Sequence, residues 1–311
     1  MNVKEILESV EDLSTGRNYW FVRTDYGKHF DEYFNGGYIA IGWGYITLND
    51  FKKLSISEIK DKIAKREGLN PIDSKEKSKI TSIYNKLERF NKLRKGDIIV
   101  VPSRKSQRLA FGEIIDDASF ESNDESVESY TKRRNVKWLE NKSIFELDPY
   151  FFRLKINQHS ISDIGSFAPY IDKEVGSLFK KGDKTHYVLN IDKQEDINFR
   201  DLSNFMDNIE RLLEDISVDF NFNDASSEFF VKMNLQSPGK MEIIKDGKSL
   251  AILAFLLFFT SCNKDPETIK DPKVKKFVIE HRETLNKTGA EIDSLEINID
   301  EIVAPFKKNG K

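Results

Sequence analysis

The first half of the chain is dominated by short apolar runs separated by turn residues, and this spacing limits the fold more than any other feature. The runs are rich in β-branched and aromatic side chains, which favours strands; they occupy residues 18–24, 38–44, 97–103, 108–116 and 150–156. Helical spacing appears between the second and third runs, where Leu69-Asn70-Pro71 divides two helices. Short strands with helices inserted early predict a mixed, mostly antiparallel small β-barrel.

The pattern of the sequence changes near residues 157–165. After this point, residues 202–217 place their apolar side chains on one face of a predicted helix. Strand-like runs follow at residues 218–222, 228–235 and 241–244. We therefore expect an α+β protein of two domains, in which residues 1–160 form the barrel and residues 161–311 form a smaller α+β domain.

Composition limits the classes of function. Of the 311 residues 32% are charged, both signs are interspersed, and the net charge is −3, so any nucleic-acid surface has to be a local basic patch. A single cysteine, Cys262, excludes an intramolecular disulfide, and four scattered histidines form no zinc-ligand pattern. We expect a cytoplasmic protein without a metal or other cofactor.

Five motifs in the first half occur in an order that resembles a known family. The motifs YWFVR, GYIAIGWG, KGDIIVVPS, AFGEI and RRNVKWL follow one another between residues 17 and 156. Together they resemble the PUA-like domain, related to EVE and YTH domains, that begins Mrr-type restriction proteins and other prokaryotic defence proteins. The resemblance implies a small β-barrel with inserted helices whose mouth binds a nucleobase, often a modified one flipped out of its stack.

The resemblance also implies a base pocket built around the second motif. Glycines beside a pocket permit close approach of backbone and ligand, and an aromatic face supplies stacking. The candidate pocket residues are Trp20, Gly42, Trp43, Gly44, Asp97 and Trp138. The alternative interpretation makes Trp43 a core residue where a strand bends at a barrel corner, with glycines that mark bulges and with Asp97 as an ordinary turn residue.

Basic residues near these motifs are candidates for contacts with the phosphates on either side of an extruded base. They are Arg23, Arg104, Lys105, Arg108, Lys132, Arg133, Arg134 and Lys137. Alternatively, Arg134 packs on an aromatic ring or pairs with the acidic loop at residues 119–130. Clusters of charge are also common on solvated faces.

The second half lacks the motifs of an enzyme. We find no acidic residue followed by the Asp/Glu-x-Lys pair of a metal-dependent nuclease, no nucleophile elbow and no phosphate-binding glycine loop. The resemblance implies that the partner is nucleic acid carrying a modified base, or a nucleotide, and that the role is a sensing module of a prokaryotic anti-phage defence or restriction system. A modification-dependent nuclease with an unrecognised site is the weaker alternative.

Residues 249–262, SLAILAFLLFFTSC, form the most hydrophobic stretch of the chain. Fourteen uncharged residues fall short of the roughly 20 that span a bilayer, and runs of this length are more often buried helices. A second hypothesis is a defence effector whose helix associates with the inner membrane or with another copy of the chain. The residues expected to carry that contact are Leu250, Leu253, Phe255, Leu257 and Phe258.

Overall fold

The computed structural model describes residues 1–13, 16–122, 130–224, 227–233, 239–261, 265–298 and 306. It divides into two compact units, one of residues 17–175 and one that combines residues 1–16 with residues 176–311. The division therefore differs from the expected boundary at residue 160 at both ends. The short helix α1 (Val3–Glu8) joins the C-terminal unit because it buries Ile6 in that unit's core, and strand β1 (Glu11–Asp12) pairs with β9 (Leu178–Lys181) there.

The unit of residues 17–175 is built on one mixed sheet with the strand order β3-β7-β5-β4-β2-β8, and β6 pairs with β7 beside this path. Only β2 and β4 run parallel to each other; the other pairs are antiparallel. The strands are β2 (Tyr19–Val22), β3 (Tyr38–Ile41), β4 (Ile98–Pro102), β5 (Arg108–Ile114), β6 (Phe120–Glu121), β7 (Lys132–Ser143) and β8 (Ile161–Asp163).

The long strand β7 curls this sheet into a half-barrel. Its first residues, from Lys132 to Asn135, pair with β3, whereas its later residues pair with β5. The register with β5 shifts between Phe111 and Gly112, and a Cβ at Gly112 would lie 2.4 Å from Cγ1 of Val136. The bulge and the missing side chain let the two strands approach closely where β7 bends.

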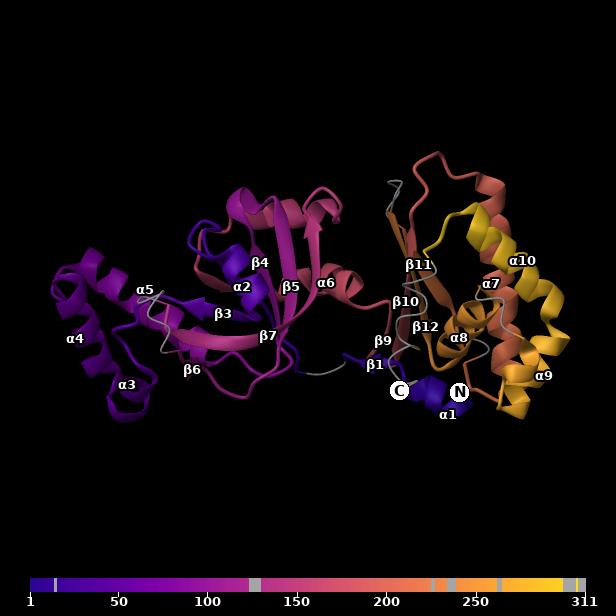
Figure 1. The fold of residues 1–311 in the computed structure, drawn as a ribbon, viewed down its shortest axis with the longest axis horizontal. Helices are drawn as coiled ribbons and strands as arrows, with labels where there is room; N and C mark the ends of the chain where they lie inside the picture. Colours follow the sequence, from indigo (N-terminus) through magenta and orange to yellow (C-terminus); the bar gives the residue numbers. More distant parts are fainter. Residues whose placement is uncertain are drawn as a thin grey trace. The chain divides into compact units, whose positions relative to one another are not determined.

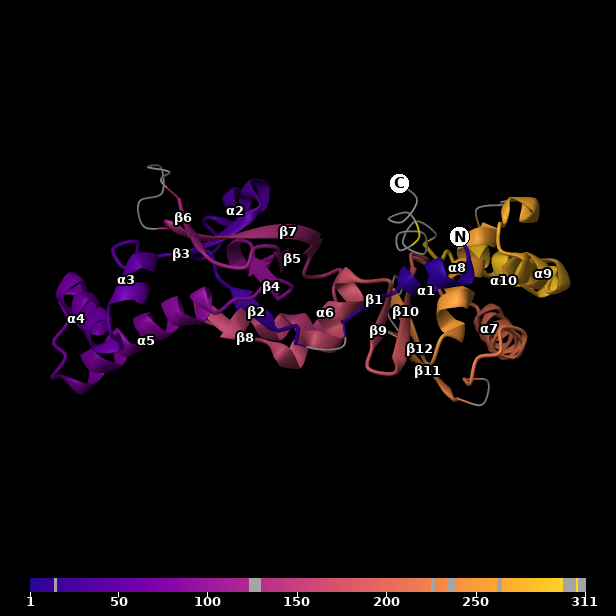
Figure 2. The same cartoon turned by 90° about the horizontal axis from the view of Figure 1, so that it is seen from below.

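Helices cover both faces of the sheet, because alternate strand residues point to opposite faces. In β4, Ile99 and Val101 pack against α2, α4 and α5, whereas Ile98 and Val100 belong to a second core with η3 and α6. Helices α3, α4 and α5 lie together beyond the β3 end of the sheet (Figures 1 and 2). The helices are α2 (Phe30–Gly36), α3 (Leu48–Lys53), α4 (Ile56–Glu67), α5 (Ser74–Asn91), η3 (Pro149–Ile156) and α6 (Ala168–Val175).

Residues 150–156 are helical, and the prediction of a strand there is wrong. Asp148 accepts a hydrogen bond from the backbone N–H of Tyr150, and Pro149 follows it at the first helical position. The buried side chains are Phe151 and Leu154, three residues apart, which matches a 3₁₀ turn. A run this short fits both the two-residue period of a strand and the three-residue period of a 3₁₀ helix. The Asp148-Pro149 start favours the helix.

The other unit has a five-stranded sheet with the order β1-β9-β10-β12-β11, where only β1 and β9 are parallel. Its remaining strands are β10 (Lys184–Ile191), β11 (Phe229–Met233) and β12 (Gly239–Asp246). Its remaining helices are α7 (Phe199–Asp219), α8 (Ser249–Ser261), α9 (Pro272–Glu280) and α10 (Arg282–Ser294). The predicted strand at residues 218–222 is absent there, because Val218 and Asp219 complete the last turn of α7 and a turn follows.

The apolar helix α8 is the centre of this unit's core. It lies between the sheet and helices α7 and α10, as Figure 1 shows, and it contacts α1 and β10 as well. Every side chain from Ser249 to Phe259 is buried, so Leu250, Leu253, Phe255, Leu257 and Phe258 all pack within the unit. This packing confirms the interpretation of residues 249–262 as a buried helix, and the side chains named by the second hypothesis face the core. No helix in the described part of the chain has both the length and the apolarity to cross a bilayer. Cys262 falls outside the described residues.

Candidate functional site

The segment Gly42-Trp43-Gly44 forms a turn at the end of β3. The strand ends at Ile41, and the backbone N–H of Ile46 donates to the Trp43 carbonyl at 3.0 Å. Trp43 has φ of 58°, in the left-handed region. This conformation is an outlier for a bulky side chain and costs roughly 1–2 kcal/mol.

Lys132 stabilises this turn by binding its backbone. Its Nζ donates to the carbonyl oxygens of Trp43 at 2.9 Å and Ile46 at 2.7 Å. The side chain is fully buried, and this burial lowers the pKa of Lys132 to about 8. Lys132 is therefore not available to a phosphate, contrary to its prediction, and instead fixes the conformation of Trp43.

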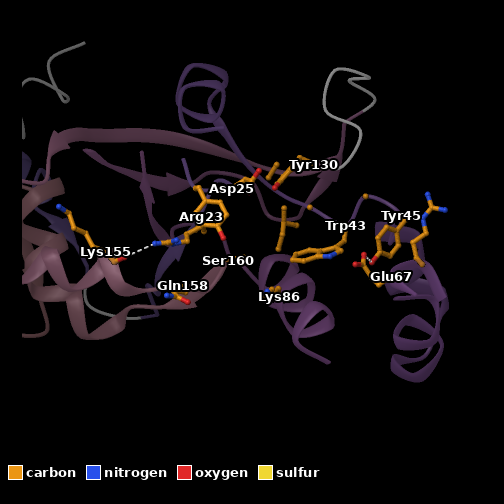
Figure 3. A pocket seen from close by; sticks show the side chains of 17 residues that line it. Arg23, Asp25, Trp43, Tyr45, Glu67, Lys86, Tyr130, Lys155, Gln158 and Ser160 are labelled. Atoms are coloured by element: carbon orange, nitrogen blue, oxygen red, sulfur yellow. Dashed lines mark hydrogen bonds between the residues drawn. The ribbon is translucent and has the colours of Figure 1, made fainter. Parts of the chain in front are cut away.

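The turn lines a pocket with a volume of about 880 Å³. We call it the Trp43 pocket. It lies where β2 and β3 end, with α4 and α5 on one side and the segment after η3 on the other (Figure 3). Its lining is formed by Val22, Arg23, Asp25, Tyr26, Ala40, Ile41, Gly42, Trp43, Gly44, Tyr45, Arg66, Glu67, Lys86, Tyr130, Lys155, Gln158 and Ser160.

On the side of the pocket formed by α4 and α5, two cationic side chains lie close to aromatic rings. The ammonium of Lys86, on α5, lies 5.3 Å from the centre of a Trp43 ring. The guanidinium of Arg66 lies 5.9 Å from the Tyr45 ring, and the Tyr45 hydroxyl donates to Oε1 of Glu67 at 2.5 Å. Burial and this carboxylate raise the pKa of Tyr45, so its hydroxyl stays protonated at neutral pH.

Polar groups lie at the opposite end of the Trp43 pocket. Figure 3 shows Arg23, Gln158 and Ser160 there, and Asp25 and Tyr130 along the upper rim. Burial, followed by the charge of Asp25, raises the pKa of Tyr130. The pocket therefore combines an aromatic face with several hydrogen-bond donors and acceptors, the combination that binds a flat heteroaromatic ligand in a fixed orientation.

Three predicted pocket residues have structural roles away from the Trp43 pocket. Asp97 is buried and accepts hydrogen bonds from Trp20 Nε1 at 3.0 Å, from the backbone and side-chain nitrogens of Asn18, and from the Arg94 backbone. Trp138 donates from Nε1 to the Tyr33 carbonyl at 3.2 Å and packs on Phe34. Trp20, Asp97 and Trp138 join strands and helices to one another, and none of them lines the pocket.

Two further basic residues of β7 have partners within the protein. The Arg134 guanidinium is fully buried and donates to Asp116 Oδ1 at 2.7 Å, to the Asp116 carbonyl at 2.8 Å and to the Leu93 carbonyl at 2.6 Å. Arg133 is buried with its guanidinium 4.2 Å from the Tyr38 ring. Both differ from the predicted phosphate contacts, because the Arg134 guanidinium is occupied by Asp116 and Leu93 and the Arg133 guanidinium lies against an aromatic ring. Lys137 is exposed on the same strand.

The basic loop between β4 and β5 divides into two parts. Arg104 and Lys105 are exposed and line a smaller hollow next to the Trp43 pocket. Arg108 donates to the side chain and carbonyl of Asn141, both at 3.1 Å, and lines neither hollow. Arg23 lines both hollows.

Several lining residues were missed in the sequence, among them Tyr45, Arg66, Lys86 and Tyr130. Arg66 and Lys86 belong to helices with many exposed lysines and glutamates, and nothing in their spacing separates a residue that faces a pocket from one that faces solvent. Tyr45 directly follows the glycine-flanked tryptophan, and that proximity was the one available signal. Among the described residues, no three His, Cys, Asp or Glu side chains are grouped to hold a metal.

A comparison with known protein families finds a match to part of the chain. The family model of a domain of unknown function, DUF8426, matches residues 20–165. This segment contains every residue that lines the Trp43 pocket. No curated protein and no solved structure matches the chain.

Proposed function

We propose that residues 17–175 bind a nucleobase in the Trp43 pocket, and that this binding serves to sense a modified base or nucleotide within a prokaryotic defence or restriction system. The observation that carries the proposal is the left-handed conformation of Trp43 at the pocket wall. Strained residues persist where the surrounding structure imposes them, and they cluster at ligand sites. Here Lys132 imposes the strain through the two carbonyls of the turn.

The chemistry of the lining suits a base. The Trp43 side chain is only half-buried, so its ring remains available for stacking, which contributes about 1–3 kcal/mol per base. Asp25, Gln158 and Ser160 offer both acceptors and donors to a base edge. A volume of about 880 Å³ leaves room for a substituent on the ring and for the attached sugar.

The fold is consistent with a PUA-like module. The five sequence motifs fall on β2, β3, β4, β5 and β7 of one curled sheet, and the pocket lies at the ends of β2 and β3. In the PUA-like interpretation this end of the sheet is the mouth that receives the base. The interpretation rests on the order of the motifs and on the half-barrel shape.

The proposal is tested by calorimetric titration of the full chain with short oligonucleotides that carry cytosine, methylated cytosine, hydroxymethylated cytosine or methylated adenine. We expect selective binding of one of them, and a loss of about tenfold or more in affinity for Trp43→Ala. The fold should persist in this variant, because Lys132 binds the backbone of residue 43 and not its side chain.

The matched control is Trp138→Phe, which changes a tryptophan outside the pocket and should leave affinity unchanged. Equal affinity of the Trp43→Ala variant and the wild-type protein, with an unchanged melting temperature, would overturn the proposal. So would the absence of binding to all four oligonucleotides.

A further inference from the structure

A second hollow of about 270 Å³ adjoins the Trp43 pocket. The two share Arg23, Tyr26 and Lys155 in their linings. The remaining lining residues are Gly27, Pro102, Ser103, Arg104, Lys105 and Ser106. We call this hollow the Arg104 pocket.

The lining of the Arg104 pocket is basic. It contains two arginines and two lysines, and no carboxylate among the described residues lines it. The side chains of Arg104 and Lys105 are exposed, and neither forms a hydrogen bond or ion pair with the described part of the chain. The Lys155 ammonium lies 4.8 Å from the Phe152 ring. Positive charge without a protein counter-charge favours an anionic ligand.

Arg23, which lines both hollows, has an unused donor. Its Nε is buried without a hydrogen-bond partner among the described residues, and its Nη2 donates only to the Lys155 carbonyl, at 3.4 Å. Leaving a buried donor unpaired is destabilising, and more so for a charged group. An acceptor oxygen beside Arg23 would remove that cost, and a guanidinium pairs well with phosphate oxygens.

The backbone keeps this loop next to Arg23. Gly27 lies so close to the loop that a Cβ at this position would be 2.2 Å from the Arg104 nitrogen. Gly27 also has φ of 87°, so a side chain is excluded both by space and by conformation. The close contact places the basic loop at the junction of the two hollows.

We propose that the Arg104 pocket binds the phosphate of the nucleotide whose base occupies the Trp43 pocket, so that the ligand is a nucleoside phosphate. The identity of the base part rests on the function proposed above, whereas the anion site rests on the basic lining and on Arg23. The phosphate belongs either to a free nucleotide or to a nucleic-acid backbone, and both sources present the same oxygens.

The test compares full-length wild-type protein with the double variant Arg104→Gln, Lys105→Gln. The probes are the nucleoside of the preferred base, its 5′-monophosphate and an oligonucleotide containing it, each titrated at two salt concentrations. We expect the wild-type protein to bind a phosphate-bearing probe about tenfold or more tightly than the nucleoside, the effect of one or two charge-assisted hydrogen bonds. The double variant should lose this difference.

Arg108→Gln is the matched control, because Arg108 lies in the same loop and is bound to Asn141 outside the pocket. It should preserve the preference for phosphate. A preference for the monophosphate assigns the site to a free nucleotide. A preference for the oligonucleotide alone assigns the site to a nucleic-acid backbone. The slope of log affinity against log salt concentration should then fall by roughly 0.7 per lost contact in the double variant.

The two proposals fail separately. Equal affinity of the wild-type protein for all three probes, or a preference that survives in the double variant, would overturn the phosphate site and leave the base pocket standing. Inorganic phosphate is titrated as a fourth probe. Phosphate binding that disappears in the double variant, together with no nucleoside binding, would support the anion site and overturn the base pocket.

Discussion

Two clusters of basic residues look alike in the sequence and behave differently in the structure. On β7, Lys132 and Arg134 are fully buried and bind backbone carbonyls and a carboxylate. In the loop after β4, Arg104 and Lys105 are exposed beside a hollow and have no partner in the described part of the chain. The first cluster stabilises the fold, and the second is available to a ligand.

The difference follows from the position of each cluster in the sheet. Lys132 and Arg134, two residues apart, lie on the same face of β7, where the turn after β3 and the segment after α5 supply the carbonyls that bind them. In the loop after β4, by contrast, the side chains of Arg104 and Lys105 are exposed. Charge alone therefore does not identify a nucleic-acid surface, since burial decides which cations can reach a phosphate.

The largest expected effect is on stability, at Arg134. Arg134→Met leaves Asp116 and the Leu93 carbonyl without their buried donors and should lower the free energy of unfolding by about 3–5 kcal/mol. The same change at Arg104 should stay within about 0.5 kcal/mol. Urea unfolding read from tryptophan fluorescence measures this, because all three tryptophans lie in residues 17–175. Similar losses at both positions would contradict the distinction.

A second prediction compares two tryptophans. Trp138→Ala removes a ring packed on Phe34 and should cost about 3 kcal/mol or more. Trp43→Gly also removes a partly buried ring but relieves left-handed strain, so the free energy of unfolding should stay within about 1 kcal/mol of wild type. Denaturation followed by circular dichroism at 222 nm measures both. A loss at Trp43 as large as that at Trp138 would make Trp43 a core residue, the alternative considered from the sequence.

The smallest effect is the pH dependence contributed by Lys132. Its pKa is about 8 in the folded protein against an ordinary value of 10.5, so the unfolded chain binds more protons between these values. The free energy of unfolding should therefore rise with pH from about 8 upward, and Lys132→Met should abolish that contribution. The measurement is the difference in stability between the two proteins at pH 7.5 and pH 9.5. A difference independent of pH would exclude a depressed pKa.

Much of the fold of residues 17–175 could be predicted from the sequence. The strands at Tyr19–Val22, Ile98–Pro102 and Arg108–Ile114 follow from apolar and alternating runs, and the break at Asn70-Pro71 separates α4 from α5. Residues 150–156 were mistaken for a strand, because a short apolar run fits both the period of a strand and that of a 3₁₀ helix. The pairing of β1 with β9, which places the N-terminus in the other unit, is a long-range contact that local pattern does not encode.

The candidate site could be predicted only in part. The glycine-flanked Trp43 indicated a pocket wall, and Arg23, Arg104 and Lys105 were among the expected phosphate contacts. Asp97 and Trp20 were wrongly assigned to the pocket. Nothing in the sequence indicates that a turn carboxylate and a strand tryptophan are hydrogen-bonded to each other. Which helical cations face the pocket depends on how α4 and α5 pack beyond β3, and that packing is set by the whole core.

The most direct measurement of the central claim is a crystal structure of the full chain with the 5′-monophosphate of the preferred base. The account predicts a base stacked on the ring of Trp43, with Trp43 still in the left-handed conformation, and a phosphate between Arg23 and Arg104. A nucleotide bound elsewhere on the molecule, or a Trp43 ring packed into the core with the pocket closed, would contradict it.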